Sequence, residues 1–199
     1  MGTMNDENKT RPVLNSRFFN SKYEQADLKN QRLNISQKYL GVDSQTDHAN
    51  TPTFDVVEII KKVETDTILP VPKFNYLHSS IKPDETAKKW GFSLDPKIAE
   101  LTITLNCLGL YTASACEGHL DRGEPYPEIS FWNEEFFKVL GYLKEWGSPL
   151  KQKVMIRSSQ TITDEVEGQM FEIFFYGTSL EESQKYSNEF LEFLRARAM

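Results

Sequence analysis

From residue 93 onward, the spacing of apolar residues alternates between helical and strand periods, and this order constrains the fold most. Asp95 and Pro96 predict a helix start, as N-cap and first helical residue. An apolar stripe of Ile98, Leu101, Leu105 and Leu108 follows, and Gly109 ends it. A strand pair, a helix, a second strand pair and a last helix come next. The order predicts an α+β fold, with a four-stranded, mainly antiparallel sheet and helices on one face.

The later elements have local signals of their own. Asn133 is expected to cap a helix that reaches Trp146 and stops at Gly147. Gly141 within it lowers helix propensity by roughly 1 kcal/mol relative to Ala. Residues 152–162 and 169–176 have the pattern of an antiparallel strand pair. Ser179 and Glu182 form a capping box at the start of the last helix.

Residues 51–199 are predicted to form a single domain behind a polar, largely flexible tail of residues 1–50. Removing residues 1–45 is expected to leave the melting temperature nearly unchanged. A weak helix over residues 24–40, ending at Gly41, is the alternative, with the aromatic residues Phe18, Phe19 and Tyr23 as anchors for a protein partner. A helix is predicted from Phe54 to Val63, with Thr53 as N-cap. The irregular residues 64–92 are expected to cover the Cys116 loop.

Composition narrows the class of protein. The formal net charge is −6, so broad nucleic-acid binding is not expected. Lys151, Lys153 and Arg157 form a local basic strip, which we interpret as a solvated strand edge protected by charge. No apolar run is long enough for a membrane span, and the N-terminus lacks a signal-peptide core. Two cysteines suggest no disulfide framework. These features favour a cytoplasmic protein without membrane association.

The segment 111–131 holds the chemistry-bearing residues. Thr112, Ser114 and Cys116 alternate with apolar neighbours, so a strand would place them on one face, with Cys116 at its end. The following loop contains Gly118 and Gly123 and is longer than an ordinary hairpin turn. Long loops with reactive side chains are more often functional than short turns. We therefore expect the site here.

Three chemistries fit this loop. Cys116 can be a nucleophile with His119 as the base, which makes these two the predicted catalytic residues. Cys116 and His119 can instead be two metal ligands, completed by Asp121, Glu117 or His78. Cys107 lies in an apolar pattern and is expected to be buried. One Cys-x-x-His pair is too little for a metal prediction, so the predicted site contains no metal ligand and its cofactor stays open.

The third possibility is an anion site. Backbone N–H groups around Gly118 would form a nest, while Arg122 and His119 supply positive charge. The predicted ligand-binding residues are Ser114, Glu117, Gly118, Asp121 and Arg122. A small anionic ligand is the partner that this arrangement suits.

The run from Ser114 to His119, Ser-Ala-Cys-Glu-Gly-His, followed by Arg122-Gly123 and Pro125-x-Pro127, resembles a Ser-Cys-Glu-Gly-His signature of small uncharacterised prokaryotic and phage proteins. Thr112, Ser114, Cys116 and Gly118 also resemble the Thr-Thr-Ser-Ser-Cys-Ser-Gly-Arg motif of the wybutosine-synthesis methyltransferases. That family modifies a guanosine derivative in tRNA with S-adenosylmethionine. Glu117 stands for a Ser of that motif and His119 for its Arg, so neither substrate nor cofactor carries over.

Together these features predict that residues 114–122 bind a small polar or phosphorylated, nucleotide-like ligand. Cys116 and His119 would assist group transfer or hydrolysis. The alternative is a non-enzymatic interaction protein, an effector or anti-defence factor, that engages a host macromolecule through its tail or its acidic surface.

Overall fold

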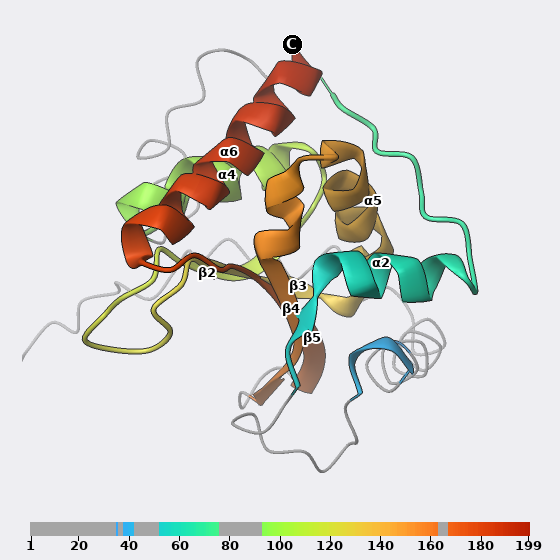
Figure 1. Ribbon diagram of the computed structural model, residues 1–199, viewed down its shortest axis with the longest axis horizontal. Coiled ribbons are helices and arrows are strands. Elements are labelled where there is room, and N and C mark those ends of the chain that lie inside the picture. Colours follow the sequence, from blue (N-terminus) through green and yellow to red (C-terminus); the bar gives the residue numbers. More distant parts are fainter. Residues whose placement is uncertain (1–34, 36–37, 42–51, 76–92, 163–166) are drawn as a thin grey trace, which may run out of the picture.

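The computed structural model describes residues 35, 38–41, 52–75, 93–162 and 167–199 (Figure 1). The strands are β1 (Phe54–Asp55), β2 (Thr112–Cys116), β3 (Glu128–Trp132), β4 (Val154–Ile162) and β5 (Glu167–Phe175). The helices are α2 (Val56–Glu64), α4 (Pro96–Cys107), α5 (Phe136–Trp146) and α6 (Leu180–Ala198), with short 3-10 turns η3 (Asn133–Glu135) and η4 (Pro149–Lys153). No helix in these described ranges is long and apolar enough to cross a membrane.

The strands form one antiparallel sheet in the order β1-β4-β5-β3-β2. The α+β class is therefore confirmed, but the predicted number of four strands is wrong because β1 adds a fifth. Phe54 and Asp55 pair with Ile156 and Met155 before the helix begins. A two-residue strand has no measurable period, so the pattern assigned Phe54 to the helix. Asp55, rather than Thr53, caps α2 by accepting a 2.7 Å hydrogen bond from Val57 N.

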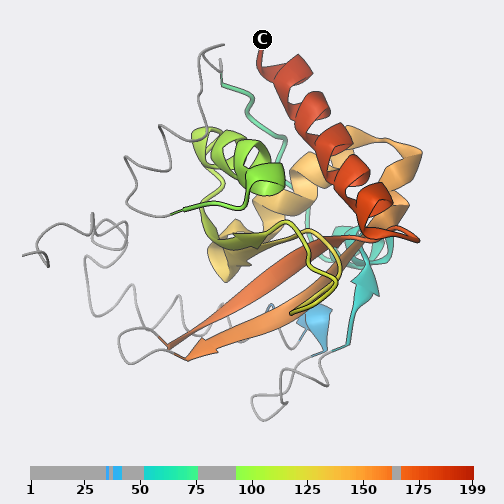
Figure 2. The ribbon, with the colours of Figure 1, turned by 90° about the vertical axis from the view of Figure 1, so that its left-hand side faces the viewer.

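The hydrophobic core lies between one face of the sheet and the helices (Figure 2). Strand residues alternate between faces, so Phe131, Phe171 and Phe175 are fully buried against the helices. α4 begins at the predicted Asp95-Pro96 pair. α5 ends at Gly147, whose φ of 62° allows the left-handed C-cap. Ser179 Oγ accepts from Glu182 N at 3.1 Å at the start of α6, as the capping box predicts.

A β-bulge between Thr112 and Ser114 alters the predicted polar face of β2. Ser114 pairs with Ser130, and Cys116 pairs with Glu128, on the face turned away from the helices. Thr112 instead accepts a 2.8 Å hydrogen bond from the amide of Asn106 on α4. The prediction that three residues share one face is thus correct for Ser114 and Cys116 and wrong for Thr112, because a bulge shifts the alternation by one residue.

Part of the predicted tail belongs to the hydrophobic core. Ile35 and residues 38–40 are helical, and Gly41 ends this turn with a φ of 64°. Tyr39 and Leu40 are 4% and 0% exposed, and the Tyr39 ring stacks on Phe136. The expectation that residues 1–45 can be removed without effect conflicts with this packing. The proposed aromatic anchors at positions 18, 19 and 23 lie outside the described residues, and the boundary at residue 51 stays a prediction.

Two predicted environments are wrong. Arg157 does not belong to a solvated basic strip, because its side chain is 20% exposed and contacts two glutamates, while Lys151 and Lys153 lie in η4. Cys107 is exposed, since it is the last residue of α4. His78 and most of the segment expected to cover the Cys116 loop lie outside the described residues.

Gly141→Ala should destabilise the protein, although Ala favours helices. A Cβ at Gly141 would overlap the carbonyl oxygen of Pro70, which is a backbone atom and not the end of a flexible side chain. Crowding of this kind typically costs about 1–3 kcal/mol, so over most of this range it outweighs the roughly 1 kcal/mol gained in helix propensity. Urea unfolding measures the difference. A more stable Gly141→Ala variant would show that the segment at Pro70 moves aside freely.

Candidate metal centre

Three side chains of different chemistry converge where β2 ends. Asp95 is the N-cap of α4, Cys116 is the last residue of β2, and His119 lies in the loop that follows. A carboxylate oxygen, the thiol sulfur and an imidazole nitrogen of these residues all lie within 4.8 Å of one another. All three side chains are partly exposed, so the cluster is accessible from solvent.

The separations suit a tetrahedral ion. His119 Nε2 lies 3.4 Å from Asp95 Oδ2. Two ligand atoms, each about 2.0–2.1 Å from a tetrahedral zinc ion, lie roughly 3.3–3.4 Å apart. A sulfur bound to the same ion would lie roughly 3.6 Å from either of them. Because the three ligand atoms lie within 4.8 Å of one another, the Cys116 sulfur needs to move closer by at most about 1.2 Å. The same 3.4 Å is longer than a typical N–H···O hydrogen bond.

Hydrogen bonds hold Asp95 toward the cluster. Its carboxylate does not cap its own helix; Oδ2 accepts instead from Glu117 N at 3.2 Å. The carboxylate of Glu117 accepts from Lys97 N at 2.9 Å and so takes over the first turn of α4. Backbone N–H groups at a helix start can attract an anion, but the N–H of Lys97 already donates to Glu117. Gln184 on α6 holds the Glu117 carbonyl at 3.1 Å.

The loop conformation depends on Gly118. Its φ of 83° lies in the left-handed region, and a Cβ there would come within 2.8 Å of Leu180 Cδ1 on α6. His119 N donates to the carbonyl of Glu124 at 3.0 Å, which closes the loop on itself. Gly118 therefore shapes the loop, since a larger residue would strain the turn and crowd Leu180 of α6.

Cys116 is not activated by its protein surroundings. Burial raises the pKa of its thiol, and the carboxylates of Glu128 and Asp95 raise it further, against an opposing hydrogen bond from the Gly118 backbone. A nucleophilic thiolate needs a nearby positive charge that lowers this pKa. A metal ion would supply that charge, because a coordinated thiol loses its proton. The role of Cys116 as a nucleophile stays a prediction.

Glu128 lies opposite Cys116 in the β2–β3 register. Its Oε2 atom is buried and has no hydrogen-bond partner among the described residues. Burial, and secondly the neighbouring Glu172, raise the pKa of Glu128 to about 7, with Arg157 opposing. Such orphaned carboxylate oxygens are rare in folded proteins and call for a partner.

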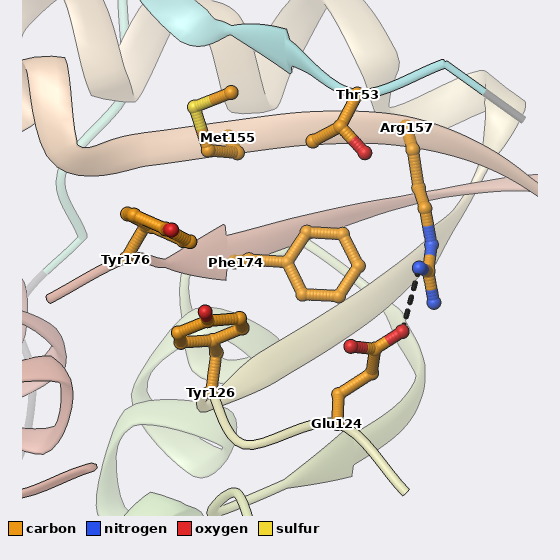
Figure 3. A pocket seen from close by; sticks show the side chains of 7 residues that line it. All are labelled: Thr53, Glu124, Tyr126, Met155, Arg157, Phe174 and Tyr176. Atoms are coloured by element: carbon orange, nitrogen blue, oxygen red, sulfur yellow. Dashed lines mark hydrogen bonds and ion pairs between the residues drawn. The ribbon is translucent and has the colours of Figure 1, made fainter. Parts of the chain in front are cut away.

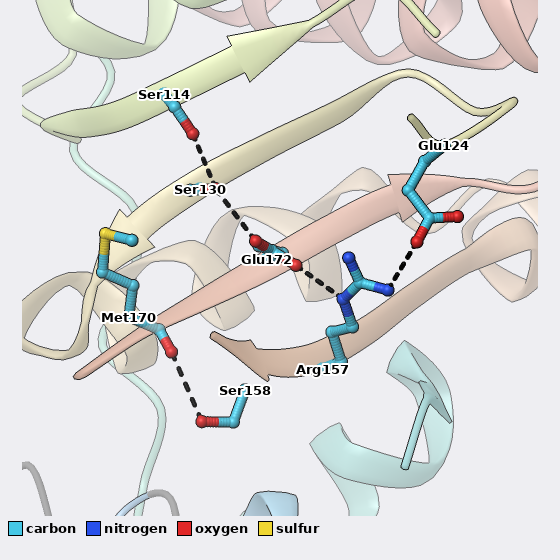
Figure 4. A network of polar contacts seen from close by, with 7 residues as sticks. All are labelled: Ser114, Glu124, Ser130, Arg157, Ser158, Met170 and Glu172. Carbon is cyan, nitrogen blue, oxygen red and sulfur yellow. Dashed lines mark hydrogen bonds and ion pairs between the residues drawn. The ribbon is translucent and has the colours of Figure 1, made fainter. Parts of the chain in front are cut away.

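The same face of the sheet carries Arg157, which lines a pocket beside Glu124 (Figure 3). Arg157 Nε donates to Glu172 at 2.6 Å, and its Nη1 donates to Glu124 at 2.8 Å. The contacts continue from Glu172 to Ser130 at 3.5 Å and on to Ser114 at 2.9 Å (Figure 4). One chain of polar contacts thus joins four strands and the loop.

Sequence reasoning found some of these residues and missed others. Asp121 and Arg122, predicted as ligand-binding, are exposed and make no hydrogen bond or ion pair to any residue in the described ranges. Asp95 was interpreted only as a helix cap. Glu172 is absent from the sequence-based prediction, although a charged residue inside the apolar run 170–175 is a usable signal.

Comparison of the chain with models of protein families, with curated proteins and with solved structures finds no match.

Proposed function

We propose that Asp95, Cys116 and His119 bind a zinc-like divalent ion, and that the ion activates water for hydrolysis of a small polar ligand. The observation that carries this proposal is the convergence of three different ligand atoms, two of them at a tetrahedral edge length.

The donor set favours zinc over other common ions. Magnesium and calcium prefer oxygen ligands, whereas sulfur and imidazole nitrogen together suit zinc. Structural zinc sites have four protein ligands, and catalytic ones keep a position open. Three ligands with partly exposed side chains match the catalytic class.

The chemistry divides between the ion and the protein. A zinc ion lowers the pKa of a coordinated water toward neutrality, so the water can act as a nucleophile. The unpartnered Oε2 of Glu128 would accept the proton that the water releases and return it to the leaving group. The Glu117 N–H donates to the Asp95 carboxylate and orients it, as hydrogen bonds to metal-binding side chains commonly do. The expected phosphorylated, nucleotide-like ligand stays a prediction.

Zinc affinity tests the site. In protein first stripped with a chelator, Asp95→Asn, Cys116→Ser and His119→Ala should each weaken zinc binding by about 100-fold or more. Losing only a residue that hydrogen-bonds to a metal ligand already costs about 10–100-fold. Competition with a chromophoric chelator measures the affinity, and circular dichroism checks the fold. Asp121→Asn is the matched control, with the same chemical change at an exposed position of the same loop. Equal zinc affinity in all four variants would refute the site.

A further inference from the structure

A second feature of the open sheet face is a pocket of about 300 Å³ with aromatic walls (Figure 3). Tyr126 comes from the loop, Phe174 from β5 and Tyr176 from the residue after β5. Ligand pockets range from about 300 to 1,000 Å³, so this one has room for a single ring system rather than for a large ligand.

Aromatic rings supply much of the apolar lining of the pocket. The Tyr126 and Tyr176 ring centroids lie 4.6 Å apart, with 40° between their planes. Phe174 is 3% exposed, and the Arg157 guanidinium lies over its ring at 4.5 Å from the centroid. Tyr176 is 48% exposed, so a large part of its side chain is open to a ligand. Aromatic faces of this kind bind planar rings by stacking.

The polar edge of the pocket presents a donor beside an acceptor. Arg157 uses Nε and Nη1 for Glu172 and Glu124, and its Nη2 has no hydrogen-bond partner in the described part of the chain. The Oε1 atom of Glu124 accepts the hydrogen bond from Arg157 Nη1, and the Glu124 side chain is 39% exposed. A free N–H group and a carboxylate oxygen therefore lie side by side.

Charge restricts the ligand further. The two negative charges of Glu124 and Glu172 exceed the single positive charge of Arg157, so an anionic ligand would meet net repulsion. A cation would compete with Arg157 itself for the same carboxylates. A neutral ring whose edge carries one acceptor and one N–H donor pairs with both Arg157 and Glu124 at no such cost.

We propose that this pocket binds a neutral, planar nitrogen heteroaromatic ring of the nucleobase type, stacked on Tyr176 and hydrogen-bonded to Glu124 and Arg157. The loop that carries Glu124 also positions His119, whose backbone N–H donates to the Glu124 carbonyl. Binding of the ring itself needs no metal. The inference rests on the proposed function only where it makes this ring a part of the hydrolysed substrate.

Titration calorimetry with adenosine, cytidine, guanosine and uridine tests the pocket directly. We expect at least one nucleoside to bind with a dissociation constant below about 1 mM, and Tyr176→Ala to weaken it about tenfold or more, the effect of losing one stacking partner. Tyr111→Ala is the matched control, because Tyr111 has a similar exposure of 40% and does not line the pocket. Glu124→Gln should change the order of preference among the nucleosides, because an amide replaces a pure acceptor.

Three outcomes would overturn the proposal. The first is that no nucleoside binds. The second is that the Tyr176→Ala and Tyr111→Ala variants bind nucleosides equally well. The third is that phenylacetate, a neutral ring that carries an anionic carboxylate, binds more tightly than every nucleoside. Asp95→Asn separates this proposal from the metal site, since it should lose zinc affinity while it keeps nucleoside affinity. If the protein bound a nucleoside but not zinc, the pocket proposal would stand and the metal-dependent function would be refuted.

Discussion

Arg157→Ala should lower the free energy of unfolding by about 3–5 kcal/mol, the usual cost of removing one partner of a buried ion pair. Glu172, the partner of Arg157, has a side chain that is 9% exposed. Without the guanidinium its charge stays buried and uncompensated, beside Glu128 on the same face. The variant also loses the contact between Arg157 and Phe174. Urea unfolding at neutral pH measures the change.

Arg195 provides a matched control for this prediction. It too contacts two glutamates, Glu100 at 2.8 Å and Glu192 at 3.3 Å, but its side chain is 36% exposed. Surface pairs contribute at most about 1 kcal/mol, so Arg195→Ala should have a small effect. Glu172→Gln in the Arg157→Ala background should restore part of the stability, because it removes the unpaired charge. Equal losses for both arginines would contradict the argument from burial.

Leu40→Ala should cost about 2–5 kcal/mol, as large-to-small substitutions at fully buried leucines do. Leu40 is 0% exposed and belongs to the main core cluster. Deleting residues 1–45 should cost more still, because it also removes the stacked contact of Tyr39 with Phe136 and its edge-on contact with Phe137. Urea unfolding of both proteins against the full chain gives the two values.

Lys38→Ala is the control in the same segment. Lys38 is 48% exposed and forms a 3.0 Å ion pair with Asp66, so its loss should cost less than about 1 kcal/mol. If Leu40→Ala were no worse than Lys38→Ala, or if the deletion kept full stability, the segment would be dispensable, as the composition of residues 1–50 predicts.

Local signals in the sequence determined most of the helices and strands. The Asp95-Pro96 start of α4, the Ser179-Glu182 box of α6 and the Gly147 end of α5 all appear where the sequence predicts them. Caps and periodicity act within one or two turns, so they can be recognised without knowing the rest of the fold. The sequence did not predict β1 or the bulge at Thr112, because each depends on pairing with a neighbouring strand.

For the candidate site, the sequence by itself determined which side chains are available and that Cys116 and His119 lie close together, since only two residues separate them. Tertiary structure alone decided that Asp95 completes the cluster and that Arg157 lies between Glu124 and Glu172. The physical reason is that strand register and helix packing set the distances between residues far apart in the chain, and no local pattern encodes those distances.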